Sequence, residues 1–142
     1  MTSERIARDY LKRARLRRRA LDTLFAGEGY ADVVREAHEV SELVLKGALR
    51  FVGVDPPKRH DVRGAVVREI GRFPQPWRDE LARLAEQASA LAAERGHAFY
   101  GDEDNLVGAS ELFGTEEASK ALELVDGLLG FYAALLGEST AR

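Results

Sequence analysis

The chain has 142 residues, of which 45% are hydrophobic and 32% charged, and its formal net charge is −3. This composition excludes a disordered chain and fits a soluble globular protein, with a length that suits a single domain over residues 1–142. There is no cysteine, which excludes disulfides, thiolate metal sites and a cysteine nucleophile and favours a cytoplasmic location.

The N-terminal residues are charged, and no apolar run approaches the about 18 residues of a membrane span, so we expect neither a signal peptide nor a membrane segment. Positive charge gathers near the N-terminus, in Arg5, Arg8, Lys12, Arg13, Arg15, Arg17, Arg18 and Arg19. This run is either an exposed helix face that pairs with acidic neighbours or a surface for phosphates or an acidic partner. Three consecutive arginines cover almost the whole circumference of a helix, so part of the run must face solvent or a partner.

Apolar residues that recur with the 3.6-residue period predict two long helices, over residues 4–26 and 30–52. Asp55 and the two prolines after it end the second helix, because proline lacks the N–H and restricts the residue before it. A short third helix is predicted over residues 60–70.

The next long helix is predicted over residues 77–95, with Pro76 at its first position. Residues 96–114 lack periodicity and are predicted as a long connection, a type of segment that is usually functional or mobile. Thr115 is predicted as the N-cap of the last helix, which runs to about residue 136. The whole pattern predicts an all-α fold, an up-and-down bundle of four long helices with one additional short helix.

The chain contains no glycine-rich nucleotide loop, no Walker loop and no His-Glu-x-x-His zinc motif. His38 lies four residues before Glu42, so the two could form a metal-ligand pair, but no third ligand is visible; otherwise His38 is a solvent-facing or capped histidine. We therefore predict neither a metal site nor a cofactor.

A basic turn follows the second helix, with Lys58, Arg59 and Arg63 around His60 and Asp61. Next to a helix start, whose free N–H groups favour an anion, this turn predicts a phosphate-binding site. The alternative is that His60 or Asp61 simply caps the third helix.

Glu42 and Lys46 are one helical turn apart, in the order that gives a surface pair worth about 0.3 kcal/mol. They lie close to the apolar stripe of their helix, where a lysine usually has a specific role.

From Glu42 to Leu49, and again from Pro56 to Val62, the sequence resembles the family of HEPN domains. In that family a glutamate and a lysine one turn apart precede a proline-containing turn and a His-Asp pair. Residues 99–102 resemble the family's Arg-Tyr-Pro-Asp segment, and residues 115–131 resemble the start of its final helix.

The resemblance implies a small helical bundle, often a homodimer, that is associated with nucleotides or RNA and often with a minimal nucleotidyltransferase in toxin–antitoxin systems. By position it makes Lys46, His60, Asp61, Tyr100 and Asp102 the candidate binding residues. We add Lys58, Arg59 and Arg63 as phosphate ligands, and Tyr100 could stack on a base.

Ribonuclease members of the family carry an arginine four to six residues before a histidine, a spacing that is absent here. The first hypothesis is therefore a non-catalytic binding module. The second is a metal-independent ribonuclease that uses His60 with Arg50 or Arg63, or His97 with Arg95. The third is a protein-interaction bundle that docks through Arg15, Arg17 and Arg18.

Overall fold

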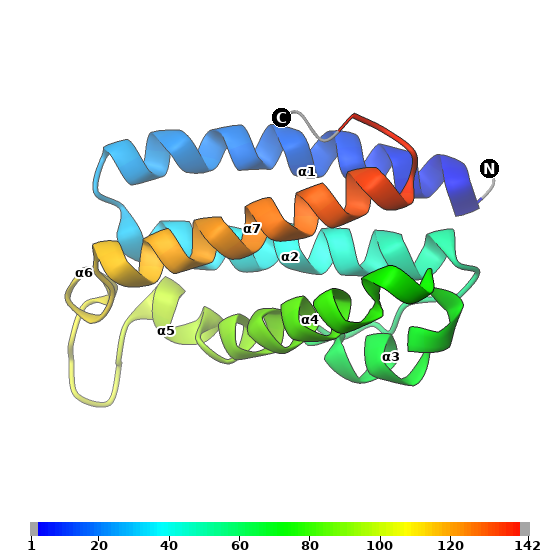
Figure 1. The fold of residues 1–142 in the computed structure, drawn as a ribbon. Coiled ribbons are helices and arrows are strands. Elements are labelled where there is room, and N and C mark those ends of the chain that lie inside the picture. Colours follow the sequence, from blue (N-terminus) through cyan, green and yellow to red (C-terminus); the bar gives the residue numbers. More distant parts are fainter. Residues whose placement is uncertain (1–2, 140–142) are drawn as a thin grey trace.

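A computed structural model describes residues 3–139, which are all-helical apart from turns and loops, so the all-α prediction is confirmed (Figure 1). The described residues form α1 (Ser3–Ala26), α2 (Tyr30–Phe51), α3 (Arg63–Arg68), α4 (Arg78–Ala93), α5 (Arg95–Tyr100), α6 (Ala109–Leu112) and α7 (Thr115–Leu135). Two short 3₁₀ turns, η1 (Ile70–Arg72) and η2 (Gln75–Trp77), connect α3 to α4. None of the described helices is long and apolar enough to cross a membrane.

The four long helices α1, α2, α4 and α7 lie side by side and run in alternating directions (Figure 1). The central one is α2, which packs against α1, α4, α5 and α7. This position follows from its sequence, because its valines, alanines and leucines occupy most of the helix circumference and twelve of its residues are buried. The side chains on the remaining open side of α2 are therefore held on a rigid helix.

The short elements differ from those predicted. The helix expected over residues 60–70 begins only at Arg63 and ends at Arg68, and η1 follows it. Pro76 lies in the 3₁₀ turn η2 rather than at the start of α4. The connection expected over residues 96–114 contains most of α5 and all of α6, so three short α-helices are present among the described residues in place of one.

The N-cap of α7 is Gly114 and not Thr115, which is the first helical residue. The Glu117 carboxylate accepts a hydrogen bond from the Gly114 N–H at 2.8 Å, which satisfies a free donor of the first turn. The prediction of acidic residues in this turn is confirmed, and only the capping residue is wrong.

Arg18 is buried, with 5% of its surface exposed, although Arg17 and Arg19 beside it are exposed. Its guanidinium donates to Asp126 of α7 at 2.8 Å and to Asp22 at 2.7 Å. Burial alone would lower the pKa of Arg18, but these carboxylates more than offset it and the pKa is raised. Arg18 joins two helices and cannot belong to a docking surface on α1.

Candidate phosphate-binding site

The loop of residues 52–62 turns back along α2. Gly53, at φ +88°, closes the end of α2 with a hydrogen bond from its N–H to the Arg50 carbonyl at 3.0 Å. An extended chain of residues 53–60 spans roughly 25 Å at about 3.1 Å per residue. That is enough to travel from the end of α2 to its middle, since the helix rises about 1.5 Å per residue. His60 therefore returns to the level of His38 and Glu42.

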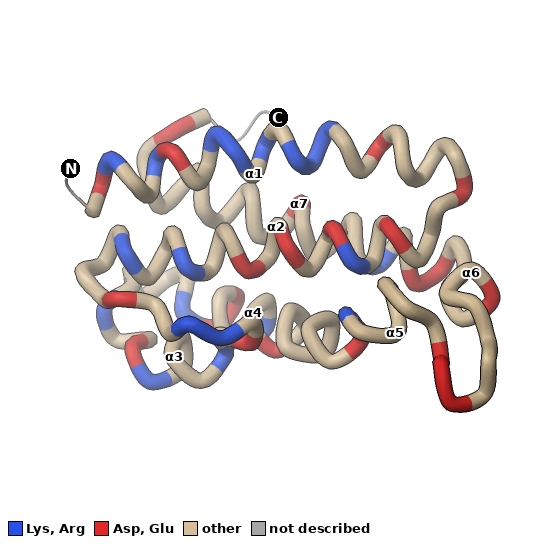
Figure 2. Tube along the Cα trace, turned by 180° about the vertical axis from the view of Figure 1, so that it is seen from behind, with Lys and Arg blue, Asp and Glu red and all other residues tan. Residues whose placement is uncertain are grey.

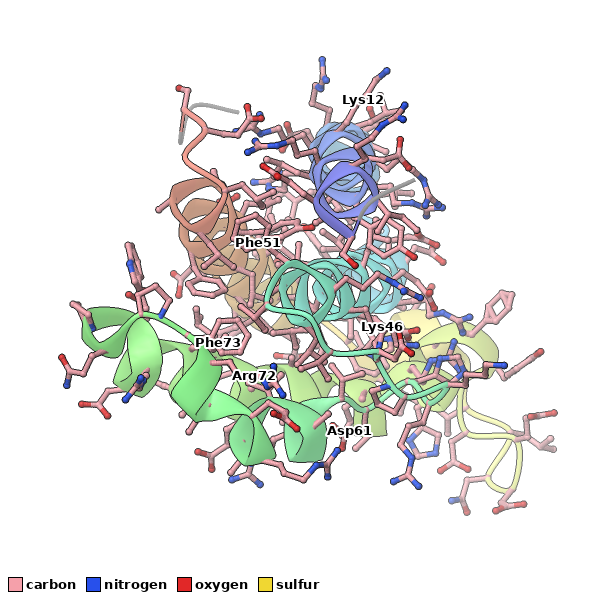
Figure 3. The ribbon with its side chains drawn as sticks, turned by 90° about the vertical axis from the view of Figure 1, so that its right-hand side faces the viewer. Lys12, Lys46, Phe51, Asp61, Arg72 and Phe73 are labelled. Atoms are coloured by element: carbon pink, nitrogen blue, oxygen red, sulfur yellow. The ribbon has the colours of Figure 1, made fainter. Side chains whose placement is uncertain are left out.

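Glu42 holds the loop and the helix together. Its Oε2 accepts a hydrogen bond from Lys46 Nζ at 2.9 Å, and its Oε1 lies 2.9 Å from His60 Nδ1. The side chains of Glu42 and Lys46 are only 16% and 19% exposed, whereas that of His60 is 57% exposed. The predicted Glu42–Lys46 pair is thus present, but half-buried and shared with a histidine. Figure 3 shows Lys46 on the side of α2 along which the loop returns.

His38 is buried beneath this loop, with 1% of its surface exposed, so the prediction of a solvent-facing histidine is wrong. Its Nε2 lies 3.3 Å from the His60 carbonyl oxygen, to which it donates when protonated at that nitrogen. Burial lowers the pKa of His38, and the nearby charge of Glu42 offsets this only in part. Among the described residues no three potential metal ligands come together. His38 therefore supports the loop from below.

Asp61 binds the first turn of α3 and ties the loop to α4. Its carboxylate accepts one hydrogen bond from the Arg63 N–H at 3.1 Å and another from the Ser89 hydroxyl at 2.6 Å. The N-cap residue of α3 is Val62, so neither His60 nor Asp61 is the predicted cap; Asp61 binds the first helical N–H from the position before the N-cap, and His60 pairs with Glu42.

Lys58 and Arg59 of this loop and Arg63, the first residue of α3, are exposed. We call these three residues the loop cations and the segment that carries them the 58–63 loop. Within the part of the chain that the structure describes, no carboxylate forms an ion pair with them. Figure 2 shows the loop cations below α2, on the same face of the molecule as the lysines and arginines of α1 and α2. An anion can thus reach all three without displacing an internal partner.

A cleft of about 280 Å³ opens between α1 and α2 on this face. It is lined by Tyr10, Arg13, Arg17, Glu39, Glu42, Leu43 and Lys46. The Arg13 guanidinium lies over the Tyr10 ring, 5.9 Å from its centroid, and Arg17 Nη1 is 3.7 Å from the Glu36 carboxylate.

Our sequence interpretation missed this cleft, although a signal was present. Tyr10, Arg13 and Arg17 are three and four residues apart, so they share one face of α1. Only the packing of α1 on α2 brings that face opposite Lys46.

The two carboxylates that line the cleft are already paired. Glu42 binds Lys46 and His60, and Glu39 accepts from Arg35 at 3.1 Å and from Arg95 at 2.9 Å. Burial alone would raise the pKa of Glu39, but the hydrogen bond from Arg95 and the charges of both arginines lower it. Arg17 in turn is paired with Glu36, so Arg13 is the cation of the lining that has no carboxylate partner among the described residues.

Tyr100 and Asp102 lie in a different part of the molecule. Phe99, next to Tyr100, packs under the Arg35 guanidinium at 4.8 Å. Arg35 precedes Lys46 by eleven residues on α2, a separation of roughly 16 Å. The structure does not bring Tyr100 and Asp102 to Lys46.

Asp102 binds within its own turn. It accepts from the Asn105 side chain at 2.8 Å and from the Asn105 N–H at 3.1 Å, and these hydrogen bonds lower its pKa. Two of the arginines considered as partners of a catalytic histidine are already engaged by carboxylates. Arg95 is engaged by Glu39, His97 is exposed on α5, and Arg50 lies 3.8 Å from Asp55.

The fold and this face define a small all-helical domain with a cationic cleft and a cationic loop beside it. The HEPN domain family model matches residues 7–135, so the chain belongs to the HEPN domain family. Neither a curated protein nor a solved structure matches the chain significantly. Family membership suggests a function related to nucleotides or RNA.

Proposed function

We propose that this HEPN domain is a non-catalytic module that binds a phosphate-bearing ligand, a nucleotide or single-stranded RNA. The cleft between α1 and α2, with Lys46 at its junction with the 58–63 loop, carries the proposal. Arg13, Arg17 and Lys46 supply cations inside the cleft, and Tyr10 supplies an aromatic ring.

The size and placement of the cleft limit the kinds of ligand that can bind there. Ligand pockets usually measure about 300–1,000 Å³, and 280 Å³ lies just below that range. A phosphate group with its sugar fits such a volume better than a dinucleotide does. In a longer RNA, further phosphates would follow the loop cations Lys58, Arg59 and Arg63.

The test is a titration of the purified protein with ATP and, separately, with a short single-stranded RNA at about 50 and 200 mM salt, the range over which phosphate contacts weaken strongly. Arg13→Glu with Arg17→Glu, and Lys58→Glu with Arg59→Glu, should each weaken binding at least tenfold. Lys120→Glu, an exposed cation on α7, is the matched control and should bind as the wild type does. Undiminished binding by both double variants would refute the proposal.

One observation favours a metal-independent ribonuclease as the second candidate. Glu42 orients the His60 ring through Nδ1, which leaves Nε2 open on a side chain that is 57% exposed. A histidine held in this way beside cations can act as a general acid or base on RNA. If the protein is a ribonuclease, it cleaves the RNA, His60→Ala abolishes this cleavage, and His97→Ala does not change the cleavage rate. Intact RNA after prolonged incubation removes this candidate.

On family membership alone we further propose a cytoplasmic homodimer that works with a minimal nucleotidyltransferase in a toxin–antitoxin-like system. Co-expression with such an enzyme followed by purification through a tag on either chain tests the partner. If the two chains never co-purify and neither nucleotide nor RNA binds, the third hypothesis of a plain protein-interaction bundle is favoured.

A further inference from the structure

Large hydrophobic side chains are exposed mainly at one end of the molecule. Within residues 3–139, four of the six large hydrophobic residues that are exposed belong to α5, α6 and the loop between them. We call them the aromatic–leucine patch: Phe99 at 55%, Tyr100 at 67%, Leu106 at 90% and Leu112 at 36% exposure. Such a gathering is more than the scattered single residues that any surface carries.

The loop that presents Leu106 has a defined conformation. Asp102 and Val107 exchange two backbone hydrogen bonds, at 2.8 and 3.0 Å. Gly101, at φ +76°, has no room for a side chain, since a Cβ there would lie 2.9 Å from the Ala109 nitrogen. Leu106 adopts φ +57°, a left-handed conformation that is unfavourable for a leucine. The loop thus adopts an unfavourable backbone conformation at Leu106 and exposes its apolar side chain to water.

The charge around the patch identifies what can cover it. Residues 96–119 contain no lysine or arginine and six carboxylates, in Asp102, Glu103, Asp104, Glu111, Glu116 and Glu117. The Arg35 guanidinium, which lies 4.8 Å from the Phe99 ring centroid, is paired with Glu39. Figure 2 shows the acidic loop at the end of the molecule beside α5 and α6. Phosphates would be repelled here, so stacking of RNA bases on Tyr100 is disfavoured. The same patch on a second copy is excluded for the same reason.

The complementary surface is present on α1. Leu16 is 62% exposed, with Lys12 four residues before it and Arg19 three residues after it, on one side of the helix. Neither cation has an ion-pair partner among the described residues. Figure 3 shows Lys12 on the side of α1 that faces away from the bundle, so this side is distinct from the cleft.

We infer that the aromatic–leucine patch of one copy binds the Lys12–Leu16–Arg19 face of α1 on a second copy. Leu16 and Leu106 supply the apolar contact, and Lys12 and Arg19 meet the carboxylates of Glu103 and Asp104. The two surfaces lie on different sides of the molecule (Figures 1 and 2), so the contact is head-to-tail, and a third copy adds to a pair in the same way. Because this contact does not close on a pair, it is a second self-association, distinct from the homodimer proposed above, and it is independent of phosphate binding.

The test is sedimentation velocity at protein concentrations up to about 0.5 mM, because contacts below about 1,200 Å² give weak complexes. The wild type should show an average mass that rises with concentration above the 15.7 kDa of one chain, and less so in high salt. Leu106→Ser and Leu16→Ser should each weaken the association at least tenfold. Val67→Ser, at a residue 48% exposed on α3, is the matched control and should change nothing.

A charge exchange then decides between this contact and any other. The variant Glu103→Lys with Asp104→Lys and the variant Lys12→Glu with Arg19→Glu should each, when alone, lose the rise of average mass with concentration, since both surfaces of each then carry one sign. An equimolar mixture should associate again. A wild type whose average mass does not rise with concentration, a rise that the leucine substitutions leave unchanged, or a mixture that shows no rise would each overturn the inference. RNA binding by the double variants, measured in parallel, shows whether the phosphate site is intact.

Discussion

Gly47 lies where α2 meets the buried ring of Tyr132, whose hydroxyl donates to the Ala7 carbonyl. A Cβ at this position would lie 2.7 Å from Tyr132 Cζ and 3.2 Å from Tyr10 Cδ2. We expect Gly47→Ala to destabilise the fold by about 1–3 kcal/mol, as overpacking of a core does. Gly130→Ala is the control, because Gly130 lies inside α7 with nothing within 4 Å of its Cβ position. That substitution should stabilise the fold by about 0.5–1 kcal/mol through helix propensity. Urea unfolding of both variants measures the two effects, and equal stability of the two would contradict the packing argument.

His38 makes stability depend on pH. Its pKa is lowered in the folded state by burial, while an unfolded chain has the ordinary value of about 6.5. As pH falls below about 6.5 the unfolded state therefore binds a proton that the folded state does not, so stability falls with pH, by at most about 1.4 kcal/mol per pH unit. His38→Gln, which retains an N–H donor for the His60 carbonyl, should flatten this dependence below about pH 6.5. The carboxylate of Glu39, whose pKa is also lowered, contributes only from about pH 4.5 downward.

The control for the pH experiment is His97→Gln, which changes an exposed histidine. Chemical denaturation at several pH values provides the free energies of unfolding. A His38→Gln protein with the same pH slope as the wild type would show that another group is responsible.

At the scale of helices, the neighbouring arginines of α1 have different roles, although they stand next to one another in the sequence. Arg18→Met removes hydrogen bonds to Asp126 and Asp22 that fasten α1 to α7 and stabilise its own turn. We expect a loss of about 1–2 kcal/mol, reduced from the range for fully buried charged hydrogen bonds because both carboxylates are partly exposed. Arg19→Met should change stability by less than about 0.5 kcal/mol, as exposed substitutions do. Thermal and urea unfolding should therefore show a larger loss of stability for Arg18→Met than for Arg19→Met. Equal losses would contradict the role of Arg18 in joining α1 to α7.

Periodicity was sufficient to predict the four long helices, because an apolar stripe repeated over sixteen or more residues has few alternatives. It could not predict α5 and α6, which span six and four residues and contain too few turns to show a period. Local spacing also predicted the Glu42–Lys46 pair, which needs only one helix. The partners of His38 and Arg18 come from distant parts of the chain, so neither role could be read from neighbouring residues.

At the scale of the whole molecule, a net charge of −3 conceals a strong separation of charge. Cations occupy the face formed by α1, α2 and the 58–63 loop, while carboxylates dominate the end beside α5 and α6 (Figure 2). A polyanion approaching the molecule is attracted to the first region and repelled by the second, although the net charge alone would predict weak repulsion. If RNA is the ligand, as proposed, this distribution orients it before any contact forms.

This separation predicts how RNA binding depends on salt. The cationic face offers six positive side chains, in Arg13, Arg17, Lys46, Lys58, Arg59 and Arg63. If three to five phosphates are contacted, the logarithm of the association constant should fall with the logarithm of salt concentration with a slope of about −2 to −4. Lys58→Ala with Arg59→Ala removes two contacts and should make the slope shallower by about 1.4, while Lys120→Ala should leave it unchanged. Fluorescence anisotropy of a labelled single-stranded RNA across a salt series gives the slopes. A wild-type slope near zero would mean that phosphates are not the bound groups, and an unchanged slope in the double variant would move the contacts away from the loop.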